Sequence, residues 1–360
     1  MLHLRGEAAL DDGQLATLTA VTRAASTLSG AGVITIISTY ALSKHFRNPM
    51  HRLIVINAFY NAFDVICTMI STSGPRAGNS SALCQFQAFL NQMFPIADVL
   101  WTLAMAVNVY FIVHRSYDAE SLRRLEWRYM IGITTVTFIP AFVLLFISND
   151  DNGPMYGSVT LWCAIAPRWV LFRIILYYVP IWSSILITIA LYILVGIEIS
   201  KRRRELRSIS SNVHSAALDD VIPQAVHDST SCANSTSAEY DSHATPSEDG
   251  SPTPKYTYTA YTTTRMRPAK TATSLSFRQY ILMPLFFFLA LLLVWVAPST
   301  NRVAAFVDPT FSSYPLMLVV GITGSLRGFW NGLVFVIVGM RSWKRRKESD
   351  ELALRPVTRG

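Results

Sequence analysis

The stretch covering residues 84–113, CQFQAFLNQMFPIADVLWTLAMAVNVYFIV, constrains the fold more than any other part of this sequence. Its 30 residues are overwhelmingly apolar, and a helix of this length can cross a lipid bilayer with some tilt. One carboxylate, Asp98, lies near its middle. Because a charge in contact with acyl chains is costly, Asp98 is expected to face other helices or water. The stretch therefore predicts a core helix of a membrane-embedded bundle.

Six further apolar windows, each of about 20 residues, accompany this helix. They cover residues 24–43, 53–72, 129–147, 170–197, 280–298 and 313–340. Together the windows predict an all-α bundle of seven transmembrane helices. The composition agrees, since 51% of the residues are hydrophobic and only 15% are charged, whereas soluble domains carry about 25% charged residues.

The distribution of Lys and Arg predicts the orientation of the bundle. In alternate loops and the tail, 24 of the 31 Lys and Arg residues gather on one side, which the positive-inside rule assigns to the cytoplasm. The amino terminus is then outside and the carboxyl terminus is cytoplasmic. The net charge of +8 is a topology signal and does not indicate nucleic acid as a partner.

The predicted spans divide the chain into five parts. These are a short extracellular segment (1–23), helices 1–5 (24–199), a third cytoplasmic loop (200–278), helices 6 and 7 (279–340) and a basic cytoplasmic tail (341–360). The first residues lack the pattern of a cleaved signal peptide, so the first span is expected to act as an uncleaved signal anchor.

Two of the four cysteines, Cys84 and Cys163, lie on the predicted outer side. Cys84 begins the third span, and Cys163 lies in the loop between the fourth and fifth spans. Disulfides persist in oxidising compartments, so we expect these two thiols to form a bond that holds this loop over the mouth of the bundle. Cys67 falls within a span and Cys232 in a cytoplasmic loop, where thiols stay reduced.

Two N-glycosylation sequons occur, at Asn79 and Asn234. Asn79 lies in a short outer loop and is the candidate glycosylation site, whereas the predicted topology puts Asn234 in the cytoplasm. Because the loop that carries Asn79 is short, the sequence leaves open whether the glycosylating enzyme can reach this residue.

The third cytoplasmic loop has the composition of a disordered segment. Residues 208–276 contain 24 Ser or Thr among 69 residues and few large apolar side chains, too few to bury a core. Thr245, Ser251 and Thr253 each precede a proline and are candidate phosphorylation sites. The basic start of the tail resembles a short amphipathic helix on the membrane surface.

Three strings of this sequence resemble a known receptor family. Residues 84–110, CQFQAFLNQMFPIADVLWTLAMAVNVY, resemble the third helix of fungal receptors similar to the slime-mould cyclic AMP receptors. Residues 155–182, with Tyr156-Gly157 and Leu161-Trp162-Cys163, resemble the following outer loop and fifth helix, and SLRGFWNGLVF (325–335) resembles the seventh helix. The third span lacks the Asp-Arg-Tyr triplet of rhodopsin-like receptors, which is consistent with this group.

The resemblance implies a G-protein-coupled receptor in the plasma membrane. Such a protein senses an extracellular small molecule and activates a heterotrimeric G protein, and the family suggests cyclic AMP signalling. It is not an enzyme, and neither a cofactor nor a metal is implied. The expected partners are the G protein, membrane lipid and a ligand whose identity the sequence leaves open.

Candidate ligand and coupling residues follow from the two predicted ends of the bundle. A nucleotide ligand would be anionic and would favour cations near the outer mouth. The candidate ligand contacts are Arg168, Arg173, Asp98 and Trp101. The candidate G-protein contacts lie at the cytoplasmic ends of the third, fifth and sixth helices and are Arg115, Lys201, Arg202 and Arg278. The alternative explanation of the basic ends of the fifth and sixth helices is that they are attracted to acidic lipid.

Polar residues also occur deep within the predicted spans. They are Asn57, Asn61 and Asp64 on one face of the second helix, Asp98 in the third, and Arg327 and Asn331 on one face of the seventh. Arg327 replaces a Gln expected from the resemblance. Because each isolated charge at mid-membrane costs about 2.5–3.5 kcal/mol, Arg327 is expected to pair with Asp64 or Asp98. This polar core is either a switch between signalling states or a static packing network.

Three rival classes can be tested on the sequence. A retinal protein needs a Lys in its seventh helix, and residues 313–340 contain none. A membrane metalloenzyme needs inward His and carboxylate clusters, yet all seven His lie outside the predicted spans. A transporter would favour an internal repeat or broken helices, and neither is visible. A seven-helix transporter or non-signalling membrane protein remains the alternative.

Overall fold

The computed structural model describes residues 11–43, 49–115, 117, 119–219, 272–307, 311 and 313–354. The chain divides into two compact units, of which the first comprises Met1–Ser200 with Ser274–Gly360 and the second comprises Lys201–Thr273. All the predicted spans fall in the first unit. Among the described residues, six helices are each long and apolar enough to cross a membrane, and a bent pair counted as one span brings the number to seven.

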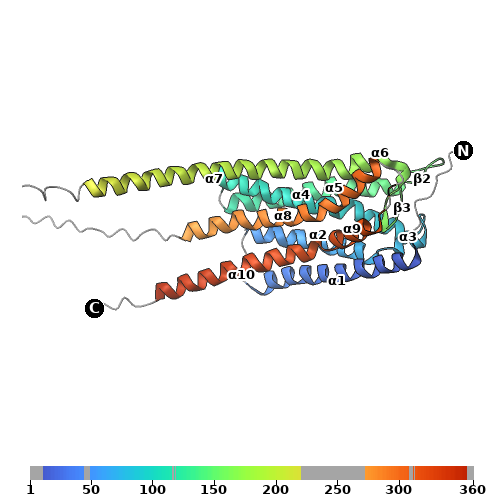
Figure 1. The fold of residues 1–360 in the computed structure, drawn as a ribbon, viewed down its shortest axis with the longest axis horizontal. Coiled ribbons are helices and arrows are strands. Elements are labelled where there is room, and N and C mark those ends of the chain that lie inside the picture. The colour runs from blue at the N-terminus through green and yellow to red at the C-terminus, as the bar shows by residue number, and fades with distance from the viewer. Residues whose placement is uncertain are drawn as a thin grey trace, which may run out of the picture. The chain divides into compact units, whose positions relative to one another are not determined.

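Helices α1, α2, α4 and α5 run side by side in the first unit (Figure 1). Their bounds are Asp12–Leu42, Pro49–Ile70, Ala82–Arg115 and Ala119–Val143. Helix α4 contacts both α2 and α5 and is the most deeply buried of the candidate spans, as its composition predicts. Helix α1 begins well before residue 24, in the segment expected to precede the first span. The backbone N–H of Asp11 donates to Oε1 of Gln14 at 3.2 Å and helps to close the first helical turn.

The fifth membrane helix changes its winding where a proline enters it. It consists of the 3-10 turn η3 (Pro167–Trp169), α6 (Val170–Arg173), the π-helical η4 (Ile174–Tyr178) and α7 (Val179–Asp219). Pro180 has no N–H to donate to the carbonyl of Leu176, four residues earlier. The buried Gln92 of α4 supplies the missing donor, with its Nε2 2.9 Å from the Leu176 oxygen. A polar side chain of the third helix therefore stabilises an irregular turn of the fifth.

The sixth helix is α8 (Ala272–Val307), and the seventh span is bent. Helices α9 (Tyr314–Ser325) and α10 (Arg327–Leu354) meet at Leu326 with an angle of 49° between them. The sequence shows no sign of a broken helix, and the expectation of unbroken spans was wrong for the seventh. The break falls among small and polar residues, where Gly324 and Ser325 precede Leu326 and Arg327. Small residues cover the backbone poorly and weaken a helix at such a point.

Helix α10 lies unusually close to α1. A Cβ atom added to Gly332 would lie 2.7 Å from Cα of Gly32, nearer than such atoms approach in folded proteins. The Ser29 side chain accepts a hydrogen bond from the backbone N–H of Phe329 at 3.3 Å. Glycines at a helix contact allow two backbones to approach in this way. The first and seventh helices are thus tightly joined next to the bend.

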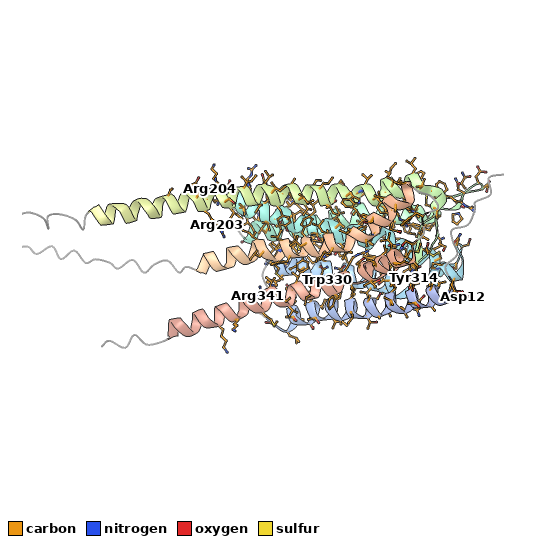
Figure 2. All side chains as sticks on the ribbon, in the orientation of Figure 1. Asp12, Arg203, Arg204, Tyr314, Trp330 and Arg341 are labelled. Atoms are coloured by element: carbon orange, nitrogen blue, oxygen red, sulfur yellow. A yellow bond between two sulfur atoms is a disulfide. The ribbon has the colours of Figure 1, made fainter. Side chains whose placement is uncertain are left out.

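Two short antiparallel hairpins and a one-turn helix cap one end of the bundle, which we call the hairpin end. Asp12 and Tyr314 lie at this end, and Arg341 lies toward the opposite end (Figure 2). The capping elements are α3 (Ser73–Ala77), η2 (Leu144–Phe146), β1 (Ser148–Asn149), β2 (Gly153–Pro154), β3 (Tyr156–Val159) and β4 (Trp162–Ile165). Strand β3 pairs with β4 from Tyr156 opposite Ile165 to Val159 opposite Trp162, and β1 pairs with β2.

The buried core follows α4. Its largest cluster joins α4 to the other six membrane helices and includes the fully buried Trp101, Met105 and Phe335. A second cluster joins Ile96 of α4 to Ile181 of α7 and Trp295 of α8. The third helix therefore contacts both halves of the bundle through apolar side chains.

Several predicted boundaries require correction. Helix α7 continues to Asp219 and α8 begins at Ala272, so both ends of the expected disordered loop (200–278) are helical. The Lys, Arg and Glu residues after Ser200 favour helix, which explains the extension. Helix α10 runs to Leu354 without a break, so the expected tail helix is a continuation of the seventh. The sites Asn234, Thr245, Ser251 and Thr253 lie outside the described residues.

Candidate ligand cavity and polar core

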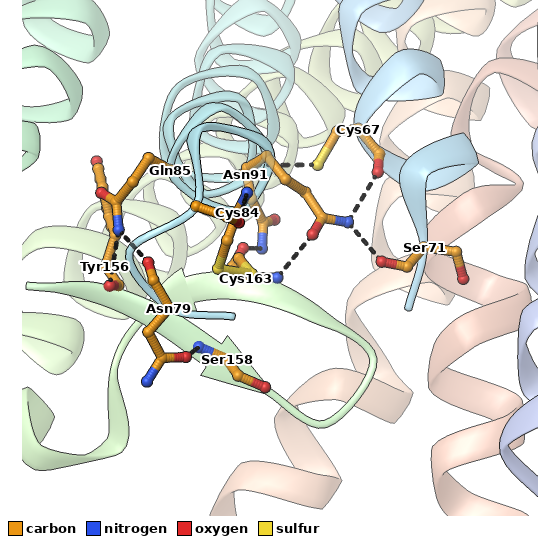
Figure 3. Close-up of a disulfide and its surroundings, with 11 residues drawn as sticks. Cys67, Ser71, Asn79, Cys84, Gln85, Asn91, Tyr156, Ser158 and Cys163 are labelled. Atoms are coloured by element: carbon orange, nitrogen blue, oxygen red, sulfur yellow. Dashed lines mark hydrogen bonds between the residues drawn. A yellow bond between two sulfur atoms is a disulfide. The ribbon is translucent and has the colours of Figure 1, made fainter. Parts of the chain in front are cut away.

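The hairpin formed by β3 and β4 is attached to the third helix. Cys84 and Cys163 form a disulfide, as the sequence predicts, with their Cα atoms 5.4 Å apart (Figure 3). Fully buried Gln87 accepts a hydrogen bond from the Cys163 backbone N–H at 2.9 Å and donates to the Ser71 carbonyl at 2.9 Å. Asn91 donates to the Cys163 carbonyl at 3.3 Å. These bonds place the hairpin firmly over α4 and α2.

Asn79, the candidate glycosylation site, lies beside this hairpin. Its Oδ1 accepts a hydrogen bond from the Ser158 backbone N–H at 2.9 Å, and its carbonyl accepts one from Gln85 at 2.7 Å (Figure 3). The residue is exposed at the hairpin end. Its modification stays a prediction.

Arg327 and Asp64 form a buried ion pair between the seventh and second helices. Nη1 of Arg327 lies 2.8 Å from Oδ1 of Asp64, and their side chains are only 10% and 7% exposed. Arg327 is the first residue of α10, directly after the bend. Of the two predicted partners for this arginine, the structure pairs it with Asp64.

Asp98, the second carboxylate of the polar core, accepts hydrogen bonds from side-chain amides. Its Oδ1 accepts hydrogen bonds from Nδ2 of Asn57 at 2.8 Å and Nδ2 of Asn61 at 3.2 Å. Asn331 of α10 also interacts with the Asp98 side chain. All six predicted residues of the polar core are buried, and the structure brings them together across the second, third and seventh helices.

Two aromatic side chains, Trp295 and Tyr177, flank the ion pair on the side of the fifth and sixth helices. The guanidinium carbon of Arg327 lies 5.6 Å from the ring centroid of Trp295 in α8. Trp295 in turn lies against Tyr177 of the π-helical turn, with centroids 6.0 Å apart. A cation over an aromatic face is attracted by the ring electrons. Trp295 is therefore the link between the ion pair and the apolar contact of α4, α7 and α8.

Two cavities lead from the hairpin end toward the ion pair. The large cavity has a volume of about 600 Å³ and is lined by β4, the start of the fifth helix and the end of α8. The small cavity, about 70 Å³, reaches Asp64 and Arg327. The two share six lining side chains, which are Trp162, Arg173, Tyr178, Asn301, Arg302 and Val320. The cavities are therefore neighbours along one route from the hairpin to the polar core.

Only one of the four predicted ligand contacts lines these cavities. Arg173 lines both and is buried, where its guanidinium donates to the Ile165 carbonyl. Arg168 is exposed on the neighbouring 3-10 turn and lines neither. Asp98 and Trp101 also line neither, because Asp98 is bound by the amides of α2 and the fully buried Trp101 packs against Tyr60.

Arg302 is a cavity residue that the sequence analysis did not identify. It lines both cavities, and its Nε donates to the Tyr178 hydroxyl at 2.8 Å. The signal in the sequence was a lone arginine just past the sixth span on the predicted outer side, where few cations occur. Its closeness to Arg173 depends on how the helices pack, which spacing within the sequence does not reveal.

The predicted coupling residues are distributed over three helices, and Lys201 and Arg202 do not lie at a helix end as expected, because α7 continues to Asp219. Arg115 is exposed as the last residue of α4. Lys201 and Arg202 are exposed on α7 within the second unit, and Arg278 lies on α8.

Arg52 forms an ion pair of 2.9 Å with the buried Glu126. This pair joins α2 to α5 and was not predicted.

No group of three or more His, Cys, Asp or Glu that could hold a metal ion occurs in the part of the chain that the structure describes. A bundle of seven helices, a disulfide from the third helix to the following hairpin, and a cavity next to a buried polar core together describe a seven-helix membrane protein. Residues 12–217 match the slime mold cyclic AMP receptor family, which is more than half of the chain. The protein belongs to this family, and the predicted resemblance is confirmed.

Two curated relatives support this assignment. G-protein coupled receptor 1 of Arabidopsis thaliana is 26% identical over 180 residues, which are 49% of this chain and 51% of that protein. Ascaroside receptor GPR2 of Arthrobotrys oligospora is 23% identical over 184 residues, covering 49% of this chain and 43% of that protein. The matched region spans about half the length of each relative.

A solved structure supports the fold. The crystal structure of squid rhodopsin superposes with a TM-score of 0.61 at 11% identity and covers 96% of this chain and 87% of rhodopsin. The likeness confirms the predicted seven-helix fold. The comparisons thus identify a multi-pass membrane protein of a receptor family rather than of an enzyme family.

Proposed function

We propose that the protein is a plasma-membrane receptor that binds an extracellular small molecule at the hairpin end and activates a heterotrimeric G protein at the opposite end. One observation carries this proposal: a ligand-sized cavity adjoins a smaller one that ends on the buried Asp64–Arg327 pair. Family membership and the rhodopsin-like fold support it. Output through cyclic AMP belongs to the same proposal.

The polar core is the proposed switch. A ligand in the large cavity contacts the ends of the fifth and sixth helices, and Trp295 relays a shift of these helices to Arg327. Because Arg327 lies at the bend of the seventh helix, a change in its pairing alters the position of α10 against α2. A ligand shifts such an equilibrium only by binding one arrangement better than the other.

The proposed coupling residues are Arg115 and Arg278 of the first unit and, separately, Lys201 and Arg202 of the second. Their charges fit both a G protein and the acidic inner lipid surface, so mutation is needed to separate the two roles.

A nucleotide-exchange assay tests the receptor proposal. Membranes from cells expressing the protein should accelerate guanine-nucleotide exchange on at least one type of G-protein α subunit above membranes from cells without it. Charge reversal at the four coupling residues should abolish this acceleration at equal surface expression, whereas reversal of the exposed Arg168 should not. Exchange equal to that of empty membranes with every α subunit would contradict the proposal and favour the alternative of a transporter or non-signalling protein.

A further inference from the structure

We infer that the large cavity binds a small amphipathic acid, with an apolar body and one carboxylate-like group, and that this acid is held by Arg302 and Arg173. The inference rests on the proposed function, since it names the ligand class of the same site. It replaces the nucleotide that the resemblance suggested.

The lining of the large cavity is mainly apolar. Its walls include the side chains of Leu161, Val170, Ile174, Trp182, Phe311 and Met317. A volume of about 600 Å³ lies within the roughly 300–1,000 Å³ typical of small-molecule sites. Burial of an apolar body against such walls is favourable at about 25 cal/mol per Å². A sugar with several hydroxyl groups would instead need many polar partners there.

Among the residues that the structure describes, the charged side chains that line the same cavity all have one sign. Arg173 and Arg302 are its charged lining residues, and no Asp or Glu side chain lines it among the residues that the structure describes. Two guanidinium groups beside apolar walls make the electrostatic potential in the cavity positive, and this potential favours the binding of an anion. A carboxylate accepts two parallel N–H bonds from a guanidinium, which matches the planar fork of arginine.

Both arginines are held in place before a ligand arrives. The Nε–H of Arg302 donates to Tyr178 at 2.8 Å, which uses one of its five donors. The Arg173 guanidinium donates to the Ile165 carbonyl in β4. The Ser299 hydroxyl lines the cavity and has no hydrogen-bond partner among the described residues. A buried hydroxyl without a partner is costly, and an acidic head group near Arg302 would provide an acceptor.

The apolar walls continue onto the outside of the bundle. Val170 is 53% exposed and Trp182 is 38% exposed, although both line the cavity. Apolar side chains on the outside of a membrane bundle face lipid. The apolar body of the ligand is therefore expected to reach the cavity along the lipid-facing side of the fifth helix.

A binding assay on the purified full-length protein in lipid nanodiscs tests the inference without a G protein. The probes are octanoate, dodecanoate and phenylacetate, with 1-octanol and cyclic AMP as comparisons. Binding is read as a concentration-dependent rise in the midpoint of thermal unfolding. At least one acid should bind, at least about tenfold more tightly than 1-octanol, because charge-assisted hydrogen bonds are absent from the alcohol.

Variants of the arginine separate specific binding from partition into lipid. Arg302→Gln should weaken acid binding about tenfold and leave 1-octanol binding unchanged, and Arg302→Lys should retain part of the preference for acids. The matched control is Arg168→Gln, which removes a nearby exposed arginine and should change nothing. The unliganded midpoint of each variant reports whether it is folded.

Three results would overturn the inference: no acid binds, the acid and the alcohol bind equally, or cyclic AMP binds while the acids do not. A failure in the nucleotide-exchange assay with normal acid binding would instead overturn the receptor proposal alone.

Discussion

At the scale of single residues, the polar core divides its charges unevenly. The core contains one arginine and two carboxylates. Arg327 forms its ion pair with Asp64, whereas Asp98 accepts hydrogen bonds from the side-chain amides of two Asn residues. The sequence predicted the members of this core, because three of them share a face of the second helix. It did not predict the pairing, because the position of Arg327 depends on the bend at Leu326.

This division predicts how mutations of the core affect stability. Arg327→Gln leaves Asp64 buried without its cation, so the free energy of unfolding should fall by about 3–5 kcal/mol. Adding Asp64→Asn removes the uncompensated charge and should recover part of this loss. Asp98→Asn in the same Arg327→Gln background is the matched control. It should not recover the lost stability, because the Asp98 carboxylate still has its amide donors when Arg327 is replaced. The thermal unfolding midpoint of each detergent-purified variant gives the comparison, and equal recovery by both substitutions would argue against the assigned pairing.

At the scale of elements, the irregular parts of the fifth and seventh helices shape the candidate site. The π-helical turn carries Tyr177 and Tyr178, and the bend carries Arg327. Sequence periodicity predicted the spans but not these irregularities, since each depends on a partner from another helix. Gln92 of α4 is such a partner for the Leu176 carbonyl.

The role of Gln92 can be measured with a double mutant. Gln92→Leu leaves a buried carbonyl without a donor and should lower the free energy of unfolding by about 1–3 kcal/mol. Pro180→Ala restores a backbone N–H four residues after Leu176, so the loss caused by Gln92→Leu should be smaller in that background. Unfolding midpoints of the four proteins in this cycle are compared. Strictly additive effects would show that Gln92 does not compensate for the proline.

At the scale of the whole molecule, the seven spans and the disulfide could be predicted because lipid and oxidation impose strong constraints on sequence. The cavity could not, because its lining comes from a hairpin and three helices that are distant in the sequence. Arg302 illustrates this limit, since only packing brings it to Tyr178 and into the cavity that Arg173 also lines. The ends of α7 and α10 were also missed, because charged helix-forming residues extend a helix beyond its apolar span.

We propose that the Asp64–Arg327 pair controls signalling between the two ends of the bundle. The most direct test is basal guanine-nucleotide exchange per surface receptor in Arg327→Gln, with and without Asp64→Asn. Losing a contact that ties α2 to α10 lowers the cost of separating these helices, so Arg327→Gln should raise basal exchange, and Asp64→Asn should return it toward the unmodified level. Identical exchange per receptor in all three proteins, with only expression reduced, would show instead that the pair is a static packing contact.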